Sequence, residues 1–537
     1  MLDLRQIQSN VLRGYRYGTA AKFVHYTFVR FTDEADARAL LERLLPQVTS
    51  CEAYDRDGGA QGVLNIALAY PAIDMFGYGG QARALDATDD EATAAVEAFK
   101  CGMRARAKAY LGDDGSSAPD RWEAPYRDER LHAVFAMNAP TSDALQRVRG
   151  SVDDALAAYA SVVRVHDEAG AHFDGEWAGK EHFGFADGIA QPSVLDAGDE
   201  AYPGDGTPKK RRGWSRLRSG EFVLGQPDEL GQVQFRSAFF KNGSFMVFRK
   251  LQQHVGLYRD YVRSVAERND VTPEFVGAKM VGRWQSGAPL MRAPDEDDPE
   301  LARDPHKAND FRYCDDEFGD RCPLGAHIRR NNPREDPSGP GVVQTKLHRI
   351  IRRATPYGPQ LEPGADDDGT ERGTLFVVIN ANIARQFEFV QRNWVNSVLS
   401  STHLTFPNDR DPLIGAQHSG PRAGKYLVPN TSRNRAPLIA WDLPRFVTTR
   451  GGEYFLLPSL DTLYNLAHDV PPPPEQVDCP TLDSPDARPD ARPDVDQSVP
   501  RRTSPAPQPA CVPDTKPDQP SVGTKLRAAL KNAFDDE

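Results

Sequence analysis

Apolar and polar segments alternate along most of the chain in lengths typical of strands and helices. In the first part, strand-length apolar runs predict β-strands at 21–31, 63–70 and 131–138. Apolar residues at helical spacing follow each run and predict helices at 33–47, 91–111 and 143–160. A second series predicts strands at 244–251 and 374–379 and helices at 252–268 and 384–397.

Two series of this kind predict an α+β protein built from two halves. Each half is expected to be an antiparallel sheet with helices on one face. We place the boundary near residue 220, which gives an N-terminal domain at 1–220 and a C-terminal domain at 221–470.

The composition changes sharply near residue 470. Between Pro471 and Pro520, 15 of 50 residues are proline, which predicts an extended, disordered linker at 471–520. The last stretch, 521–537, places apolar residues such as Leu526, Leu530 and Phe534 on one helical face. It is interpreted either as a frayed terminal helix or as a peptide that docks on a protein partner or into a shell.

Charge and motifs exclude several classes of protein. A net charge of −12 argues against a general nucleic-acid binder. No run approaches a membrane span, and the start of the chain resembles neither a signal peptide nor a twin-arginine leader, so we expect a cytoplasmic protein. The six cysteines fit no zinc spacing and no Cys-x-x-Cys-His motif for covalent haem, and we expect them to be reduced. The sequence leaves the oligomeric state open.

His327, in Cys322-Pro-Leu-Gly-Ala-His327-Ile-Arg-Arg-Asn-Asn-Pro-Arg334, is the first candidate for chemistry. A lone histidine is more often an ordinary core or surface residue, but a neutral imidazole is also the usual proximal ligand of peroxidase haem iron. Such a ligand needs an acceptor for its second N–H. Asp411, in Asp-Pro-Leu-Ile-Gly415, is the candidate acceptor, although Asp-Pro is also an ordinary turn.

Asp187 lies between Gly184 and Gly188, where glycine permits positive φ and a close approach of the backbone to a flat cofactor. A tight Asp-Gly turn is the simpler interpretation. The functional interpretation makes Asp187 the acid–base that moves a proton between the two oxygens of hydrogen peroxide.

Arg352 is the candidate for stabilising the negative charge that develops as the O–O bond breaks. The adjacent Arg353 is a rival for the same role, and a plain surface cluster with Arg349 is the simpler interpretation. Spare arginines of this cluster, Arg353 included, are candidates for binding haem propionates.

Three further residues complete the candidate site. Leu375 and Phe376, on an expected buried strand, are predicted to line the cofactor pocket, a role compatible with plain core packing. Tyr357 is a candidate surface relay that passes electrons from large donors. Trp394 and Trp441 are weaker alternatives to it.

These motifs together give the chain a family resemblance. Gly184-Phe-Ala-Asp-Gly188, the His327 motif and Ile351-Arg-Arg-Ala-Thr-Pro-Tyr-Gly358 resemble the dye-decolourising peroxidases, most of all their longer bacterial and fungal members. The likeness extends over nearly everything before residue 470 and not over the tail.

The resemblance implies a fold of two ferredoxin-like domains, similar to a dimeric α+β barrel. It also implies one b-type haem per chain, bound in the second domain. Residue by residue it implies that Asp187 is the distal acid, His327 the proximal ligand of the iron and Arg352 the distal arginine, with Asp411 behind the ligand. Shorter members of the family often have asparagine two residues past the arginine, where this chain has Ala354.

The expected function is therefore that of a haem peroxidase. Hydrogen peroxide would oxidise the haem to a ferryl state, and phenols, aromatic amines or dyes would return the electrons. The alternative is a haem carrier on the same scaffold, with peroxidase activity incidental.

Overall fold

The structure is a computed structural model that describes residues 2–13, 21–80, 90–198, 200–209, 213–335, 345–397, 409–418, 423–429 and 437–470. The described residues all belong to the first of the two units into which the chain divides, residues 1–476. The predicted linker 471–520 and terminal peptide 521–537 lie outside the described residues, so both stay predictions.

An eight-stranded antiparallel sheet, in the order β4-β1-β3-β2-β12-β7-β9-β8, forms the centre of the first unit. Its strands are β1 (Phe23–Phe31), β2 (Val63–Leu68), β3 (Ala133–Ala139), β4 (Val162–Ala171), β7 (Ser244–Gln253), β8 (Ile351–Tyr357), β9 (Gly373–Asn380) and β12 (Val447–Leu457). Two separate two-stranded sheets pair β5 (Thr207–Pro208) with β6 (Trp214–Ser215) and β10 (Gly424–Val428) with β11 (Leu438–Leu443).

The same strand order occurs twice in the large sheet. Counted within each half, the first four strands lie in the order 4-1-3-2, and so do the last four. This is the ferredoxin-like arrangement, with an α-helix between the first and second strands of each half. The α+β class and the two ferredoxin-like sheets predicted from the sequence are confirmed.

The two halves meet edge to edge, and the sheet curls without closing. Leu68 of β2 pairs with Leu456 of β12 and joins the halves. At the far edges, Gly170 of β4 lies so close to β8 that a Cβ on it would be 2.6 Å from the carbonyl oxygen of Pro356. No ladder of hydrogen bonds links β4 to β8, both of which are described in full, so the sheet is not a closed barrel.

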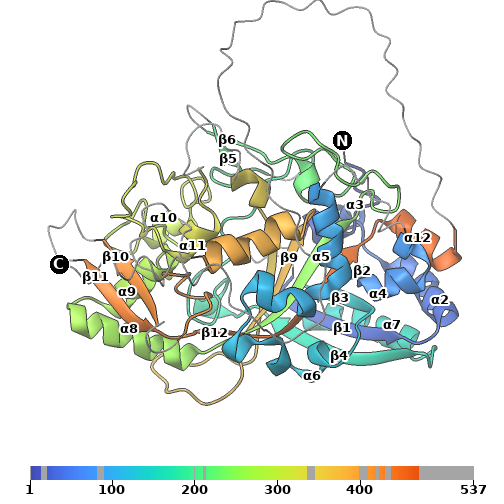
Figure 1. The fold of residues 1–537 in the computed structure, drawn as a ribbon, viewed down its shortest axis with the longest axis horizontal. Helices are drawn as coiled ribbons and strands as arrows, with labels where there is room; N and C mark the ends of the chain where they lie inside the picture. The colour runs from blue at the N-terminus through green and yellow to red at the C-terminus, as the bar shows by residue number, and fades with distance from the viewer. Residues whose placement is uncertain are drawn as a thin grey trace, which may run out of the picture. The chain divides into compact units, whose positions relative to one another are not determined.

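Helices pack around this sheet and bury apolar faces against it. In α2, Asp33 accepts the N–H of Asp36 as N-cap, and Ala37, Leu40 and Leu44 are buried. Figure 1 shows α2 and α7 beside β1–β4, with α8 and α9 at the opposite end. The α-helices are α1 (Ser9–Leu12), α2 (Glu34–Leu44), α3 (Cys51–Asp57), α4 (Tyr70–Met75), α5 (Asp90–Arg106), α6 (Ala124–Arg127), α7 (Ser142–Leu156), α8 (Val255–Asn269), α9 (Pro273–Val281), α10 (Pro299–Arg303), α11 (His327–Asn331) and α12 (Leu460–His468).

Several predicted elements differ from the structure in detail. The helix expected at 91–111 is interrupted at Gly102, whose φ is +74°. The segment expected as one helix at 384–397 consists of two short π-helical pieces, Ala384–Glu388 and Val390–Val395. Strands β4, β8 and β12 were not expected.

Two other expectations concern cysteines and membranes. Cys51, Cys314 and Cys322 are free, as expected, but Cys101 is disulfide-bonded, so the expectation is wrong for Cys101. Within the part of the chain that the structure describes, every helix is too short or too polar to span a bilayer.

Candidate active site

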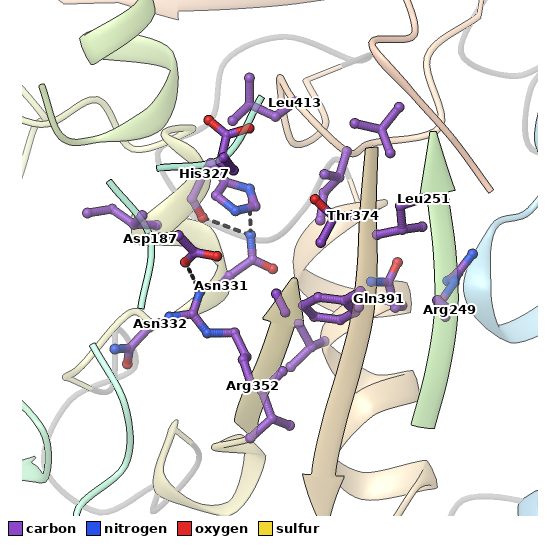
Figure 2. A pocket seen from close by; sticks show the side chains of 18 of the residues that line it. Asp187, Arg249, Leu251, His327, Asn331, Asn332, Arg352, Thr374, Gln391 and Leu413 are labelled. Atoms are coloured by element: carbon purple, nitrogen blue, oxygen red, sulfur yellow. Dashed lines mark hydrogen bonds and ion pairs between the residues drawn. The ribbon is translucent and has the colours of Figure 1, made fainter. Parts of the chain in front are cut away.

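A cavity of about 280 Å³ brings together residues from segments far apart in the sequence. Asp187 comes from the loop after β4, His327 from the start of α11 and Arg352 from β8. Figure 2 shows the three side chains directed into the same space. The sequence predicted this trio as the chemical core, and the structure places all three in one pocket.

His327 is held by one ring nitrogen and leaves the other available. Its Nδ1 lies 2.8 Å from Oδ2 of Asp411 and 3.2 Å from Nδ2 of Asn331. Among the described residues Nε2 has no hydrogen-bond partner, and the ring lines the cavity. An imidazole fixed at Nδ1 and open at Nε2 is prepared to bind a metal centre in the cavity.

Asp411 is completely buried behind His327. Its Oδ1 accepts the backbone N–H groups of Leu413 and Ile414, at 2.9 and 3.0 Å, and its Oδ2 also accepts from Asn331 at 2.8 Å. Burial raises the pKa of Asp411, but the charge and hydrogen bond of His327 and the N–H of Ile414 outweigh it and lower the pKa overall. Burial likewise lowers the pKa of His327, and Asp411 reverses the effect, so the pKa of the imidazole is raised.

Asp187 and Arg352 form the second group of the site, beside the pair of His327 and Asp411 described above. An Oδ1–Nη1 distance of 3.7 Å makes them an ion pair (Figure 2). The Gly188 N–H donates to Oδ1 of Asp187 at 2.6 Å, and the positive φ of Gly188, +76°, permits this tight turn. Arg352 is fixed by Gln191, which exchanges hydrogen bonds with its backbone, and by a 3.2 Å bond from Nη2 to the carbonyl of Ala190.

Strand alternation decides between Arg352 and Arg353. Neighbouring residues on a strand point to opposite faces, so only one of the two can face the cavity. Arg353 is buried on the other side, where it donates to the carbonyls of Asn10 and Val11 at 3.1 and 3.3 Å. The expectation that Arg353 contacts the cofactor is therefore wrong.

The same alternation separates Leu375 from Phe376. Phe376 lines the cavity, as predicted, whereas Leu375 is fully buried in the main hydrophobic core on the other face of β9. Its assignment to the pocket is wrong. Its other interpretation, plain core, is confirmed.

Tyr357 lies at the end of β8, on the Arg353 side of the strand, and is not among the residues that line the cavity. Its hydroxyl donates to Oε1 of Glu371 at 3.0 Å, and the Lys250 ammonium lies 5.0 Å from its ring centre. Only 8% of Tyr357 is exposed, so its predicted role as a surface relay stays a prediction.

Several buried guanidinium groups also line the cavity, and two of them have no carboxylate partner in the described part of the chain. Arg334 and Arg349 make hydrogen bonds to backbone carbonyls, those of Asn309 and Phe311 and those of Gly206 and Asp205 respectively. Neither forms an ion pair with a carboxylate among the described residues. Burial lowers the pKa of Arg349 to about 10, so both cations favour an anionic group in the pocket.

Two neighbours of the site were not identified from the sequence. Asn331 lies four residues after His327, and this helical spacing was a usable signal. Glu181 lines the cavity and accepts the N–H groups of Phe183 and Phe185, at 2.9 and 3.0 Å, and the amide of Gln253 at 2.6 Å. Nothing in the sequence marked Glu181, because its partners are backbone groups and a residue of β7.

The fold and the site define a peroxidase of the dye-decolourising type, and comparison with known proteins agrees. Residues 231–405 match the family model described as Dyp-type peroxidase, C-terminal. A dye-decolorizing peroxidase of Mycena epipterygia is 31% identical over 87% of this chain and 87% of its own length. The multifunctional dye peroxidase DyP2 of an Amycolatopsis species is 30% identical over 87% of this chain and 96% of its own length.

Solved structures show the same similarity. An ancestral D-type dye-decolourising peroxidase superposes with a TM-score of 0.73 at 31% identity, over 87% of this chain and 99% of its own. A dye-decolourising peroxidase in complex with 2,6-dimethoxyphenol superposes with a TM-score of 0.70 at 30% identity, over 87% of this chain and 100% of its own. The chain belongs to the dye-decolourising peroxidase family, whose members are haem enzymes.

Proposed function

We propose that this peroxidase binds one b-type haem between His327 and the Asp187–Arg352 pair and uses hydrogen peroxide to oxidise phenols, aromatic amines or dyes. The observation that carries the proposal is the geometry of one cavity. A half-free imidazole and a carboxylate–guanidinium pair line it together.

The residues of the pocket fit a haem. Nε2 of His327 would ligate the iron, while Asp411 and Asn331 fix the ring orientation from behind. Arg334 and Arg349 would hold the two propionates, because both are buried cations without a carboxylate partner in the described part of the chain. Phe376 would form part of the apolar wall. When bound, the haem iron supplies the two-electron reduction of peroxide.

On the side of the pocket away from His327, Asp187 would transfer a proton and Arg352 would stabilise negative charge. Asp187 would take the proton from one oxygen of hydrogen peroxide and give it to the other, which would leave as water. Arg352 keeps the carboxylate in place and stabilises the negative charge that grows on the leaving oxygen.

Two small aromatic donors, each giving one electron, would then complete the turnover. The complex of a related enzyme with 2,6-dimethoxyphenol supports a phenolic donor class for this chain. The cytoplasmic location and the docking of the terminal peptide on a protein partner stay predictions.

The decisive measurement is the visible spectrum of the haem-loaded protein before and after one equivalent of hydrogen peroxide. A rapid Soret change supports the proposal. An unchanged Soret band, together with fast transfer of haem to an apo-acceptor, would favour a haem carrier instead.

Two variants assign the roles. Asp187→Asn keeps the shape of the side chain but cannot take a proton, so we expect the rate with peroxide to fall by about 10²- to 10⁴-fold while haem is retained. His327→Ala is expected to lose haem or shift the Soret band. An Asp187→Asn protein that reacts at the parent rate would remove this residue from the mechanism.

A further inference from the structure

Three polar side chains that the proposed reaction with peroxide does not use are linked along the cavity. The Thr374 hydroxyl donates to Oε1 of Gln253 at 2.8 Å, and Nε2 of Gln253 donates to Oε2 of Glu181 at 2.6 Å. All three residues line the cavity. Thr374 comes from β9 and pairs in the sheet with Leu251 of β7, two residues before Gln253 (Figure 2). The linked side chains therefore present polar atoms to the cavity from the sheet and from the loop of Glu181.

Glu181 is the charged end of this link. Its Oε1 accepts one hydrogen bond among the described residues, from the N–H of Phe185 at 3.0 Å, so one lone pair of Oε1 stays open. The carboxylate forms no ion pair with any cation in the described part of the chain. Burial raises the pKa of Glu181 to about 7, so its ionised form is a stronger base than an exposed glutamate. Such a group suits a ligand that donates a hydrogen bond and can lose a proton.

Aromatic side chains flank the carboxylate of Glu181. Phe183 and Phe185 follow it on the same loop, and both line the cavity. The Phe183 ring is packed against Tyr258, with a distance of 4.5 Å between the ring centres. Phe376 lies two residues after Thr374 on β9, on the same face of the strand, and also lines the cavity. A polar group between aromatic walls can receive the hydroxyl and the ring of a phenol together.

We propose that Glu181 binds the hydroxyl group of a small phenolic donor inside the pocket and takes the proton that the phenol loses on oxidation, while Gln253 and Thr374 hold its carboxylate in place. The inference rests on the proposed function, because the oxidising equivalents come from the reaction of the cofactor with peroxide. It gives the two carboxylates of the pocket different tasks, since Asp187 serves the peroxide and Glu181 serves the donor.

The step balances for each phenol. The phenolic O–H bond breaks, one electron goes to the oxidised cofactor, and the proton forms an O–H bond with Oε1 of Glu181. The phenoxyl radical leaves the pocket, and Glu181 releases the proton for the formation of the second water. Two phenols supply two electrons and two protons in this way, and one hydrogen peroxide becomes two waters.

Thr374 and Gln253 act as positioning residues. Because the Thr374 hydroxyl donates to Oε1 of Gln253, the amide directs its Nε2 to Glu181. The carboxylate thus meets three donors, this amide and the N–H groups of Phe183 and Phe185, and they favour an ionised acceptor. Without the Thr374 hydroxyl, the amide is free to turn its oxygen towards Glu181, and the carboxylate loses a donor.

Binding of the phenol can be measured without peroxide and therefore without turnover. In equilibrium dialysis of the haem-loaded protein, Glu181→Gln is expected to weaken binding of 2,6-dimethoxyphenol by about 10- to 100-fold, because it removes a charged acceptor. The ether 1,2,3-trimethoxybenzene, which has a methoxy group in place of the hydroxyl, should bind the parent and the variant equally.

A second pair of variants keeps the shape of the side chain. Thr374→Val should weaken binding of the phenol, but not of the ether, by a smaller factor than Glu181→Gln. Thr355→Val is the matched control, because Thr355 is buried in the adjacent strand β8 and pairs with Leu375 on the face turned away from the cavity. It should leave the affinity for both compounds unchanged.

Turnover separates the transfer of the proton from that of the electron. ABTS gives up an electron without losing a proton, so Glu181→Gln is expected to lower kcat/KM for the phenol at least about tenfold more than for ABTS. Parent affinity for the phenol in Glu181→Gln, or equal losses for the phenol and the ether, would overturn the inference. Loss of phenol binding in Asp187→Asn alone would also overturn it and place the donor at the Asp187–Arg352 pair.

Failure of the proposed function would look different. A haem-loaded parent protein whose Soret band does not respond to peroxide would overturn the proposed function, whereas the dialysis result would still decide whether Glu181 binds the phenol.

Discussion

At the residue scale, the proposed roles depend on how each carboxylate is partnered. Asp411 is fully buried and saturated by the imidazole of His327, the amide of Asn331 and two backbone N–H groups. Asp187 has one guanidinium and one backbone N–H and is open to the cavity. The first arrangement fixes a charge in place, and the second leaves a carboxylate able to exchange protons.

Asp411→Asn tests the support behind His327. The amide keeps an oxygen for the N–H groups of Leu413 and Ile414 but presents an NH₂ group to Nδ1 of His327, so the imidazole loses its acceptor. We expect haem affinity to fall by about 10- to 100-fold, measured as the rate of haem transfer to an apo-acceptor. Asp409→Asn is the control, because Asp409 is also buried but pairs with Arg330 at 3.5 Å. Equal losses in the two variants would contradict a specific role for Asp411.

Glu181 gives a prediction about pH. Burial raises its pKa from 4.5 to about 7, despite the N–H groups it accepts. The folded state therefore holds this proton more tightly than the unfolded chain, and its contribution to stability is complete below pH 4.5 and lost as the pH rises to about 7. We expect the free energy of unfolding of the parent to fall, relative to that of Glu181→Gln, by up to roughly 3 kcal/mol between pH 5 and pH 7.5.

Urea unfolding of both proteins at several pH values checks this expectation. Other titrating groups, such as Glu221, are common to both proteins and cancel in the difference. A difference that does not change with pH would show that Glu181 is not protonated in the folded state near neutrality.

At the scale of elements, two glycines with different surroundings give predictions of opposite sign: Gly170 lies where the curled sheet brings β4 against β8, and Gly150 lies on an open face of α7. A Cβ on Gly170 would lie 2.6 Å from a backbone carbonyl of β8, so Gly170→Ala should cost about 1–3 kcal/mol. Gly150 lies inside helix α7 with nothing within 4 Å of an added Cβ, so Gly150→Ala should stabilise by about 0.5–1 kcal/mol. Thermal unfolding of both variants measures the two effects, and destabilisation by Gly150→Ala would contradict the stated packing.

Whether a strand could be predicted from the sequence depends on its residues. Apolar runs are recognisable, whereas strands whose charged residues or glycines have distant partners are not. Strands β1, β2, β3, β7 and β9 are apolar runs and were expected. Strand β4 carries charged residues whose partners are distant: the Glu168 carboxylate lies 3.0 Å from Lys250 of β7. In β12, Gly451 and Gly452 leave room for the Tyr126 ring and for Met103, contacts that only the folded chain reveals.

The residues of the site also divide into those that the sequence could indicate and those that it could not. Asp187, His327 and Arg352 were found because dense motifs surround them. Arg353 and Leu375 were assigned wrongly because a sequence shows that two neighbours lie on a strand but not which of them faces the pocket. Arg334, although it stands in a motif, was not singled out, since its value as a buried cation depends on the absence of a carboxylate partner in the described structure.

At the scale of the whole molecule, the catalytic unit is complete before the tail begins. Leu463 and Leu466 of α12 are in the main core, and the Tyr78 hydroxyl donates to the carbonyl of Val470 at 2.6 Å. The chain is thus anchored up to residue 470, and the pocket is built from residues that precede it.

Deletion of 471–537 separates the enzyme from its predicted docking peptide. Cys101→Ser accompanies the deletion, because Cys101 is disulfide-bonded and the deletion removes two of the chain's six cysteines, Cys479 and Cys511. We expect the rate of the Soret change with peroxide to match that of the full-length Cys101→Ser protein, and the free energy of unfolding to change by less than about 1 kcal/mol, since no described core contact is removed.

If the terminal peptide docks on a partner or shell, light scattering of the assemblies purified from cells should show a smaller particle after deletion. Assemblies of equal size would contradict docking and favour the frayed-helix interpretation, whereas loss of the peroxide reaction would show that the tail supports the catalytic unit itself.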